Sequence, residues 1–276
     1  MTSGVIWLAS YPRSGTTWLR AFLANLFNDT GQPHDINRLS EFTMSDMRAR
    51  YFEEVAKRPL AELSGDEVNQ LRPKVHHYLA TRRPHTVFLN TQHAMGHVND
   101  VPTITPDVTE GAIYVVRNPL DLVISYADHT GQDIDAAILA IGRQDNFLDT
   151  AGRMVFQYLS SWSEHVKSWT RAPGLTPHLM RYEDMSATPE KSFGDLARFL
   201  GVDTSSGRLE RAIAFSSFGE LKSQEQRHGF RERSDRTEAF FRQGREGAWR
   251  QVLTPAQVDT IVADHREVMA EFDYLP

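Results

Sequence analysis

A short segment near the N-terminus combines one permanent cation, three hydroxyl groups and a glycine in the residues Arg13, Ser14, Gly15, Thr16 and Thr17. The apolar run 5–9 precedes this segment, and the helical pattern 18–26 follows it. Backbone N–H groups converge where a strand turns into a helix, and the helix N-terminus carries partial positive charge. The segment therefore predicts a binding site for a highly anionic ligand.

This segment differs from the phosphate loop of nucleoside triphosphatases. A Walker A loop is G-x-x-x-x-G-K-[S/T], in which the lysine reaches the β- and γ-phosphates and the next hydroxyl binds Mg²⁺. The chain has no lysine after Gly15 and no glycine at the upstream position of that pattern. A phosphate–sulfate anhydride, bound without a metal ion, fits the segment better than ATP. An ordinary strand-turn-helix corner is the alternative interpretation.

A second segment has the same design. The apolar run 112–116 predicts a buried strand, and Arg117 stands at its end. Pro119 fits the first helical turn, where its missing N–H costs nothing, and Asn118 can cap the helix. Ser125 follows two turns into that helix. Arg117 and Ser125 are therefore expected to face the same ligand group.

Together the two segments resemble the nucleotide-binding signatures of the sulfotransferases that use 3′-phosphoadenosine-5′-phosphosulfate (PAPS). The resemblance implies that residues 13–17 hold the 5′ side of the nucleotide and that Trp18 lies against the adenine. It also implies that Arg117 and Ser125 bind the 3′-phosphate. The desulfated product would be 3′-phosphoadenosine 5′-phosphate (PAP), no metal would take part, and the acceptor would be a hydroxyl of a small molecule.

Three downstream segments continue the resemblance, which runs in order over residues 5–253. The Y-E-D end of 179–185 implies that Tyr182 meets the adenine. The segment 216–218 implies that Ser217 and Phe218 lie beside the nucleotide. The element 241–249 implies that its first residues close over the 3′-phosphate, namely Arg242, Gln243 and Gly244.

The expected catalytic residues are His93 and Arg13. His93 follows the apolar strand 87–91, so it is expected at the same edge of the sheet as residues 13–17, where the carboxyl ends of the strands lie. It also resembles the histidine of the family's K-T-H segment. It would accept the proton of the acceptor hydroxyl. Arg13, which stands where many members have lysine, would stabilise charge on the leaving phosphate. Thr91 replaces the lysine of K-T-H, so one cation is missing near the transferred group.

Periodicity predicts the fold. Short apolar strands near 4–9, 86–91, 111–116 and 177–181 alternate with helical stretches that include 154–169 and 189–200. This alternation predicts an α/β fold with a doubly wound parallel sheet, helices on both faces and ligands at the carboxyl ends of the strands.

We expect one sulfotransferase-like domain over residues 1–276. Residues 29–85 would form a helical insertion on the acceptor side. Residues 222–250 are rich in arginine and glutamate and poor in aliphatic side chains, and the resemblance implies that they form a lid over the cofactor. A solvated charged loop is the alternative for this segment.

Composition excludes several classes of protein. The chain has 276 residues, no cysteine and a formal net charge of −6, so it has no Cys-based metal site and lacks the basic surplus of a nucleic-acid-binding protein. No apolar run is long enough to span a membrane, and no signal region precedes the first strand. We therefore expect a cytoplasmic enzyme.

Two alternatives to a sulfotransferase remain open. One is a P-loop kinase or NTPase, which would need a lysine and a Mg²⁺-binding aspartate that are not evident in the sequence. The other is a PAP-binding protein with impaired catalysis, for which Thr91 is the only sign. The expected acceptor of a sulfotransferase is a hydroxylated small molecule, phenolic or glycosylated.

Overall fold

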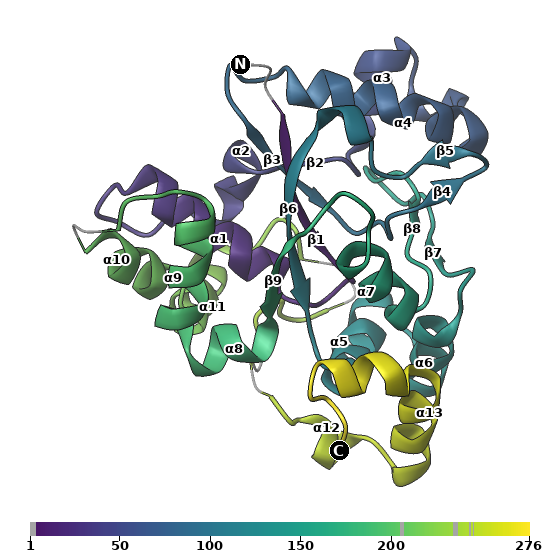
Figure 1. The fold of residues 1–276 in the computed structure, drawn as a ribbon, viewed down its shortest axis with the longest axis vertical. Helices are drawn as coiled ribbons and strands as arrows, with labels where there is room; N and C mark the ends of the chain where they lie inside the picture. The colour runs from purple at the N-terminus through teal and green to yellow at the C-terminus, as the bar shows by residue number, and fades with distance from the viewer. Residues whose placement is uncertain (1–3, 205–206, 234–236, 243, 245) are drawn as a thin grey trace. The chain divides into compact units, whose positions relative to one another are not determined.

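The computed structural model describes residues 4–204, 207–233, 237–242, 244 and 246–276. Its main sheet has five strands in the order β2-β3-β1-β6-β9, shown in Figure 1. The strands are β1 Val5–Ser10, β2 Met44–Ser45, β3 Val87–Thr91, β6 Thr109–Val116 and β9 His178–Arg181. Because β6 and β9 follow on one side of β1, and β3 and β2 on the other, the strand order reverses at β1.

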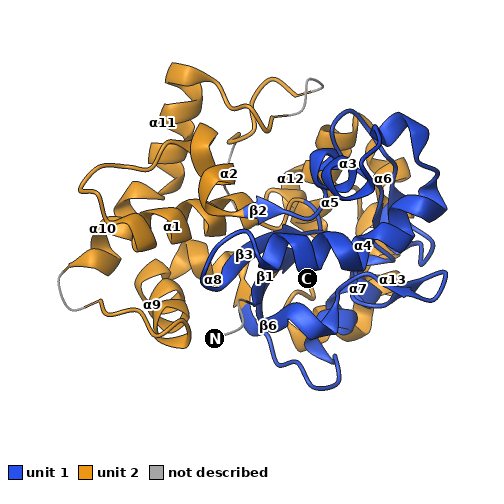
Figure 2. Ribbon diagram, turned by 90° about the horizontal axis from the view of Figure 1, so that it is seen from above, with its two compact units in different colours: residues 1–12, 44–114, 140–179 blue, residues 13–43, 115–139, 180–276 orange. Residues whose placement is uncertain are grey.

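The chain forms two compact units, drawn in separate colours in Figure 2. Unit 1 comprises residues 1–12, 44–114 and 140–179, and unit 2 comprises residues 13–43, 115–139 and 180–276. Besides strands of the main sheet, unit 1 contains α3 Ala49–Ala56, η2 Leu60–Glu62, α4 Gly65–Ala80, β4 His97–Val98, β5 Val101–Pro102, η3 Pro106–Val108, β7 Phe147–Leu148, β8 Gln157–Tyr158 and α7 Trp162–Thr170.

Unit 2 is mainly helical. Its elements are α1 Thr16–Asn28, η1 Ile36–Arg38, α2 Leu39–Phe42, α5 Pro119–Thr130, α8 Tyr182–Ala187, α9 Pro189–Phe199, α10 Arg208–Phe215, α11 Phe218–His228, α12 Trp249–Val252 and α13 Pro255–Glu271. Helix α6, Ile134–Gly142, begins in unit 2 and ends in unit 1.

The strands form where the sequence places unbroken apolar runs. Strand β1 pairs in parallel with β3, with Val5 opposite Val87 and Ala9 opposite Thr91, and β2 pairs in parallel with β3. All five residues of β3 are buried, as expected of a parallel strand covered on both faces. The four predicted strands are therefore confirmed to within two residues at each end.

One predicted helix is wrong over its first half. The apolar spacing of residues 154–169 indicated a continuous amphipathic helix, but α7 begins only at Trp162, where Ser161 caps it by accepting a hydrogen bond from the Glu164 N–H (3.2 Å). Residues 157–158 instead form β8, paired antiparallel with β7. Tertiary pairing overrides local spacing here, because the Tyr158 carbonyl accepts a hydrogen bond from Ala94 (2.8 Å).

Each unit has its own apolar core. In unit 1, Trp7, Trp162 and Trp169 are fully buried, and Trp7 Nε1 donates to Thr109 Oγ1 at 2.8 Å. In unit 2, Phe22 of α1 stacks on Phe193 of α9 with ring centroids 4.1 Å apart. A buried indole N–H usually finds a hydrogen-bond acceptor, and Thr109 supplies one for Trp7.

Candidate functional site

The predicted anion-binding segment, residues 13–17, lies where β1 leads into α1. Gly15 is the N-cap residue of α1 with φ 107°, and Arg13 also has a positive φ of 73°. A Cβ on Gly15 would lie 2.7 Å from Cδ2 of Tyr182, so only glycine fits both the backbone angle and the space. Ser14 is 1% exposed, and its Oγ has no hydrogen-bond partner among the described residues. The loop therefore presents a buried hydroxyl donor beside a helix N-terminus.

Three arginines gather at this loop in unit 2. Arg13 Nε donates to Ser125 Oγ at 2.9 Å, and Arg117 Nη1 donates to the Arg13 carbonyl at 2.9 Å. Burial, together with the positive charges of Arg117 and Arg242, lowers the pKa of Arg13 to about 10. Arg13 stays protonated at neutral pH, because about 10 is well above 7. The cluster is a concentration of positive charge that favours an anion.

Tyr182 connects this cluster to the predicted adenine side. The Arg117 guanidinium lies 4.2 Å from the centre of the Tyr182 ring, which meets Trp18 edge-on with centroids 5.7 Å apart. Arg117 Nε and Trp18 Nε1 are buried and have no hydrogen-bond partner in the described part of the chain. The structure thus brings together Arg13, Gly15, Trp18, Arg117, Ser125 and Tyr182, as the sequence expected.

Helix α5 begins as predicted. Asn118 Oδ1 accepts a hydrogen bond from the Leu120 N–H at 2.9 Å, and Pro119 is the first helical residue. Sequence reasoning missed Glu183, whose Oε1 accepts a hydrogen bond from the Asn118 N–H (3.0 Å) and whose Oε2 accepts one from the Tyr274 hydroxyl (2.7 Å). Glu183 therefore holds the turn that carries Arg117.

Asp121 of α5 binds the backbone of the element 241–249. Its Oδ2 accepts from the Gly247 N–H at 2.7 Å and its Oδ1 from the Trp249 N–H at 3.0 Å. On the same helix, Asp128 pairs with Arg242 Nη1 at 2.8 Å. Sequence reasoning missed Asp121 and Asp128, although both stand on the helix that follows Arg117. One helix thus carries Ser125 and fixes the segment that contains Arg242.

The other residues that the sequence predicts to bind the nucleotide differ in their burial and contacts. A Cβ on Gly244 would lie 2.5 Å from Cδ2 of Phe218, so this glycine packs directly on that ring. Ser217 caps α11, its Oγ accepting from the Glu220 N–H at 3.4 Å. Thr17 is half-buried, Thr16 is buried in the first turn of α1, and Gln243 lies outside the described residues.

Aromatic side chains anchor the segment 222–250. Phe230 and Phe241 are 6% exposed, and both pack in a cluster with Ala21, Ala24 and Ile36. The scarcity of aliphatic side chains suggests little apolar burial for this segment, and that suggestion is wrong, because aromatic rings replace the aliphatic side chains. An ion pair and hydrogen bonds also anchor the segment 222–250. Arg20 forms a two-bond ion pair with Glu232 at 2.6 and 3.0 Å, and Glu225 accepts from the Phe240 and Phe241 N–H groups at 2.7 and 2.9 Å. The role of the segment as a lid stays a prediction.

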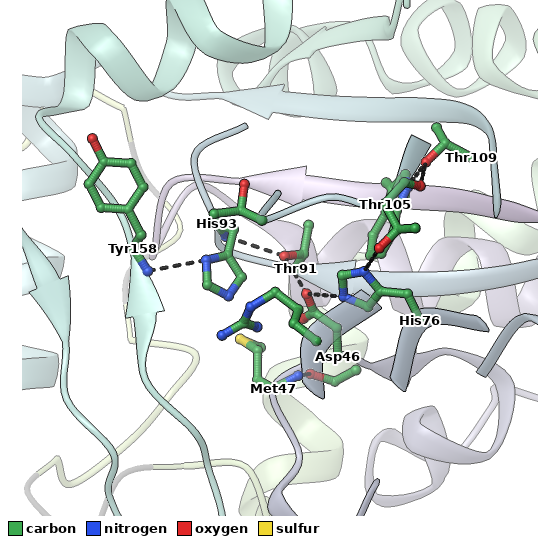
Figure 3. A network of polar contacts seen from close by, with 12 residues as sticks. Asp46, Met47, His76, Thr91, His93, Thr105, Thr109 and Tyr158 are labelled. Carbon is green, nitrogen blue, oxygen red and sulfur yellow. Dashed lines mark hydrogen bonds and ion pairs between the residues drawn. The ribbon is translucent and has the colours of Figure 1, made fainter. Parts of the chain in front are cut away.

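His93 belongs to unit 1 and is completely buried. Its backbone N–H donates to Thr91 Oγ1 (3.2 Å) and its carbonyl accepts from Trp169 Nε1 (2.8 Å). Thr91, which replaces the family's lysine, donates to Asp46 Oδ2 at 2.9 Å. Figure 3 shows these contacts continuing from Tyr158 through His93 and Thr91 to Asp46. The hydroxyl at position 91 thus joins the backbone of His93 to a buried carboxylate.

The ring of His93 is held in one tautomer. Its Nδ1 accepts a hydrogen bond from the Tyr158 N–H at 3.1 Å, so the proton of the neutral ring is on Nε2. Nε2 is buried without a partner among the described residues. Burial lowers the pKa of His93 well below its ordinary value, and the charge of Arg72 lowers it further, so the ring is neutral at pH 7. To remove a proton through Nε2, the ring must first give up the bond to Tyr158.

Two further histidines have structural roles in unit 1. His76 is completely buried. Its Nδ1 lies 2.8 Å from Thr105 Oγ1, and its Nε2 lies 3.6 Å from Asp46 Oδ2. His165 Nε2 donates to the Gln92 carbonyl (3.0 Å), and its Nδ1 accepts from the Tyr114 hydroxyl (2.8 Å). His165 therefore fixes the backbone directly before His93.

Known proteins match nearly the whole chain. The family described as Sulfotransferase domain matches residues 4–273. The chain belongs to the sulfotransferase family. This sulfotransferase is 24% identical over 283 residues to flavonol 3-sulfotransferase of Flaveria bidentis, covering 93% of the chain and 78% of the relative. It is 25% identical over 276 residues to sulfotransferase 1A1 of Canis lupus familiaris, covering 95% and 82%.

Solved structures share the fold. Mouse sulfotransferase SULT7A1 complexed with PAP superposes with a TM-score of 0.62 at 20% identity, covering 99% of this chain and 86% of that one. Retinol dehydratase in a complex with retinol and PAP gives a TM-score of 0.65 at 19% identity, covering 98% and 82%. The family and fold confirm the predictions of a PAPS-dependent sulfotransferase with a parallel α/β fold.

The described residues contain neither a cluster of metal-binding side chains nor a membrane-spanning helix. In that part of the sulfotransferase, no group of three or more His, Asp or Glu side chains is arranged to hold a metal ion. Among the same residues, no helix has the length and apolar character needed to cross a membrane.

Proposed function

We propose that this sulfotransferase binds PAPS through the arginine cluster of unit 2 and moves its sulfuryl group to a hydroxyl of a small molecule. The observation that supports the nucleotide site most directly is the contact of Arg13, Arg117 and Ser125 around a loop with buried, unpaired donors on Ser14 and Arg117. Hydrogen-bond donors and positive charge are the groups that phosphate oxygens need. When bound, PAPS supplies the activated sulfuryl group.

The individual roles follow the sequence prediction. Arg117 and Ser125 bind the 3′-phosphate, with Arg242 and the backbone near Gly244 closing over it. Residues 14–17 bind the 5′ side, and Trp18 and Tyr182 hold the adenine. Arg13 stabilises charge on the departing phosphate. The side chain of Arg13 contacts Ser125, the residue that we assign to the 3′-phosphate.

His93 is proposed as the general base on the acceptor. Its neutral ring at pH 7 suits this role, because a base must arrive unprotonated. In the tautomer described above, Nε2 already carries the ring proton, so it can donate to the acceptor oxygen but cannot take up the hydroxyl proton. The tautomer that acts as the base carries its proton on Nδ1 and has a free lone pair on Nε2, and it forms before the transfer with loss of the hydrogen bond from the Tyr158 N–H. After the transfer the ring is a cation protonated on both nitrogens. We propose a phenolic acceptor and a cytoplasmic enzyme, the latter because two Arabidopsis thaliana relatives are named cytosolic sulfotransferases.

A direct assay tests the class of reaction. The protein is incubated with PAPS and a panel of phenols, with and without EDTA, and sulfated products are measured by mass spectrometry. We expect sulfated phenol and PAP, with equal yields when EDTA is present. Turnover that EDTA stops and Mg²⁺ restores would favour the kinase-like alternative, and tight PAP binding without any product would favour the impaired PAP-binding protein.

A binding experiment tests the 3′-phosphate site. Arg117→Ala and Ser125→Ala should weaken PAP binding, each by about 10- to 150-fold, because a hydrogen bond to a charged group is worth about 1.5–3 kcal/mol. Adenosine 5′-phosphosulfate lacks the 3′-phosphate, so calorimetry should show little change for that ligand. Arg38→Ala is the matched control, because Arg38 is an exposed arginine of the same unit paired with Glu41. Equal losses for both ligands would contradict the assignment.

A further inference from the structure

Arg72 on α4 is a completely buried arginine that the nucleotide site does not use. Its only hydrogen bond in the described residues is from Nη2 to the Phe156 carbonyl at 3.4 Å, and its Nε and Nη1 have no partner there. Burial lowers the pKa of Arg72 to about 10, which still leaves it charged at neutral pH. A buried guanidinium with so few partners is costly unless another group satisfies it.

The unused donors of Arg72 form a fork. Nη2 carries two hydrogens, one beside Nε–H and the other beside an Nη1 hydrogen. Whichever of the two binds Phe156, one edge of the guanidinium keeps a parallel pair of N–H groups. Such an edge matches the two oxygens of a carboxylate.

Asp46 is the charged neighbour of Arg72, and its negative charge raises the pKa of the arginine. The hydrogen bond of its side chain, however, comes from Thr91. Asp46 Oδ1 has no hydrogen-bond partner among the described residues. The carboxylate inside the unit therefore balances the charge of Arg72 without using its donors.

Arg72 and His93 face the same stretch of backbone. Arg72 binds the Phe156 carbonyl, and His93 binds the Tyr158 N–H. Two residues span at most about 7 Å even when the chain is fully extended, so the two anchoring backbone groups are no farther apart than that. The positive charge of Arg72 also acts on the His93 ring, so the guanidinium and the imidazole are near neighbours.

Aromatic rings lie beside Arg72 and along the segment that anchors the pair. The Arg72 guanidinium lies 5.7 Å from the ring centre of Phe52 and 5.3 Å from that of Phe156. Phe147 continues the group, 6.2 Å from Phe156 and 5.0 Å from Tyr158 between ring centroids. Such surroundings suit a flat aromatic ligand.

We propose that Arg72 and His93 form an acceptor subsite in which the fork of Arg72 binds a carboxylate while His93 meets a hydroxyl at the other end of an aromatic ring. The acceptor class is then a phenol that carries a carboxylate. This inference rests on the proposed function, because it assumes that the ligand at His93 is the sulfuryl acceptor.

Binding in the presence of PAP tests the subsite without turnover. The probes are 4-hydroxybenzoate, 3-hydroxybenzoate and 4-hydroxyphenylacetate, each compared by calorimetry with its carboxamide, which keeps the shape and removes the charge. For at least one pair, the wild-type protein should bind the carboxylate about 10- to 100-fold more tightly, as expected for charge-assisted hydrogen bonds. A ratio near one for every pair would mean that water satisfies Arg72, and the inference would be wrong.

Variants assign the preference to Arg72. In Arg72→Gln the ratio should fall to about one, and Arg72→Lys, which keeps the charge but not the fork, should give an intermediate ratio. Arg82→Gln is the matched control, because Arg82 is exposed in the same unit. Unchanged PAP affinity shows that each variant is folded, and Arg72→Lys decides the matter if Arg72→Gln does not fold. A preference that survives in both Arg72 variants would overturn the proposal.

Turnover separates the two proposals. Absence of sulfated product from every phenol, charged or neutral, refutes the proposed function and leaves the binding ratio as the test of the subsite. Sulfation of neutral phenols with the same kcat/KM as their carboxylates refutes the subsite and leaves the function intact.

Discussion

His165 is expected to make the stability of this sulfotransferase depend on pH. Its ring is completely buried in unit 1, where it donates to the Gln92 carbonyl and accepts from Tyr114. Burial lowers the pKa of His165 from 6.5 to about 4. Protonation therefore favours the unfolded chain, in which the imidazole is in water.

The sign and size follow from this difference in pKa. Above pH 6.5 the ring is neutral in both states, and the full stability is present. As the pH falls from 6.5 towards 4, the unfolded chain binds a proton that the folded chain does not, so the free energy of unfolding decreases. One pKa unit corresponds to about 1.4 kcal/mol, which gives a loss of about 2 kcal/mol at pH 5 and about 3 kcal/mol in total.

Urea unfolding at pH 7 and pH 5 measures the effect. The wild-type protein is compared with His165→Asn, in which position 165 no longer titrates, and the other buried histidines are the same in both proteins. We expect the variant to be less stable at pH 7 but to lose about 2 kcal/mol less than wild type on going to pH 5. His85→Asn, at an exposed position of the same unit, is the matched control.

The comparison refutes the reasoning if the stabilities of wild type and His165→Asn fall in parallel between pH 7 and pH 5. The buried ring would then take up a proton as easily as an exposed one, and its hydrogen bonds to Gln92 and Tyr114 would not hold it neutral. The expected difference is large, because it amounts to roughly a 30-fold change in the folding equilibrium constant.

Three further predictions concern the site. His93→Ala and His93→Gln should both lower kcat by about 10²- to 10⁴-fold with PAP affinity unchanged, because neither side chain can take up a proton; near-native turnover of the Gln variant, which keeps a donor, would show that His93 only donates. Gly15→Ala should weaken PAP binding more than tenfold in calorimetry, since its Cβ would lie 2.7 Å from Tyr182, whereas Gly31→Ala, with a φ of +72° and open space around it, should leave PAP affinity unchanged. Hydrogen exchange should show new protection of residues 240–250 when PAP binds, because the ligand brings a phosphate to Arg242; equal protection with and without PAP would make the segment a static wall.

The sequence predicted the strands and the turns from strand into helix at residues 13–17 and 117–119 well, because these features are local. An apolar run followed by a glycine-containing turn specifies a strand end and a helix start without knowledge of the rest of the chain. The cap of α5 by Asn118 is of this kind. The same holds for the grouping of Arg13 with Arg117, since parallel strands end at one edge of a sheet.

Features that depend on distant partners were not predictable. Arg72 is one arginine among several in a polar stretch, and nothing local shows that α4 turns it inward. The wrong helical prediction for residues 154–161 has the same origin. The backbone of Tyr158 forms hydrogen bonds with the Ala94 N–H and with His93 Nδ1, and both partners are distant in the sequence. Asp121 and Glu183 were missed because their partners are backbone N–H groups and, for Glu183, the distant Tyr274 hydroxyl, and neither kind of contact can be recognised in the sequence.

Asp121 of α5 binds the backbone of residues 247–249, and these contacts have a consequence for folding during translation. Arg117 is 104 residues from Arg13, Trp249 is 128 residues from Asp121, and Glu232 is 212 residues from Arg20. A ribosome releases the N-terminal loop long before these partners exist, and domains fold as units once their contacts are available. The contacts of α5 with residues 247–249 can therefore form only after translation has passed Trp249, and we expect that an unfinished chain does not bind PAPS at the proposed nucleotide site.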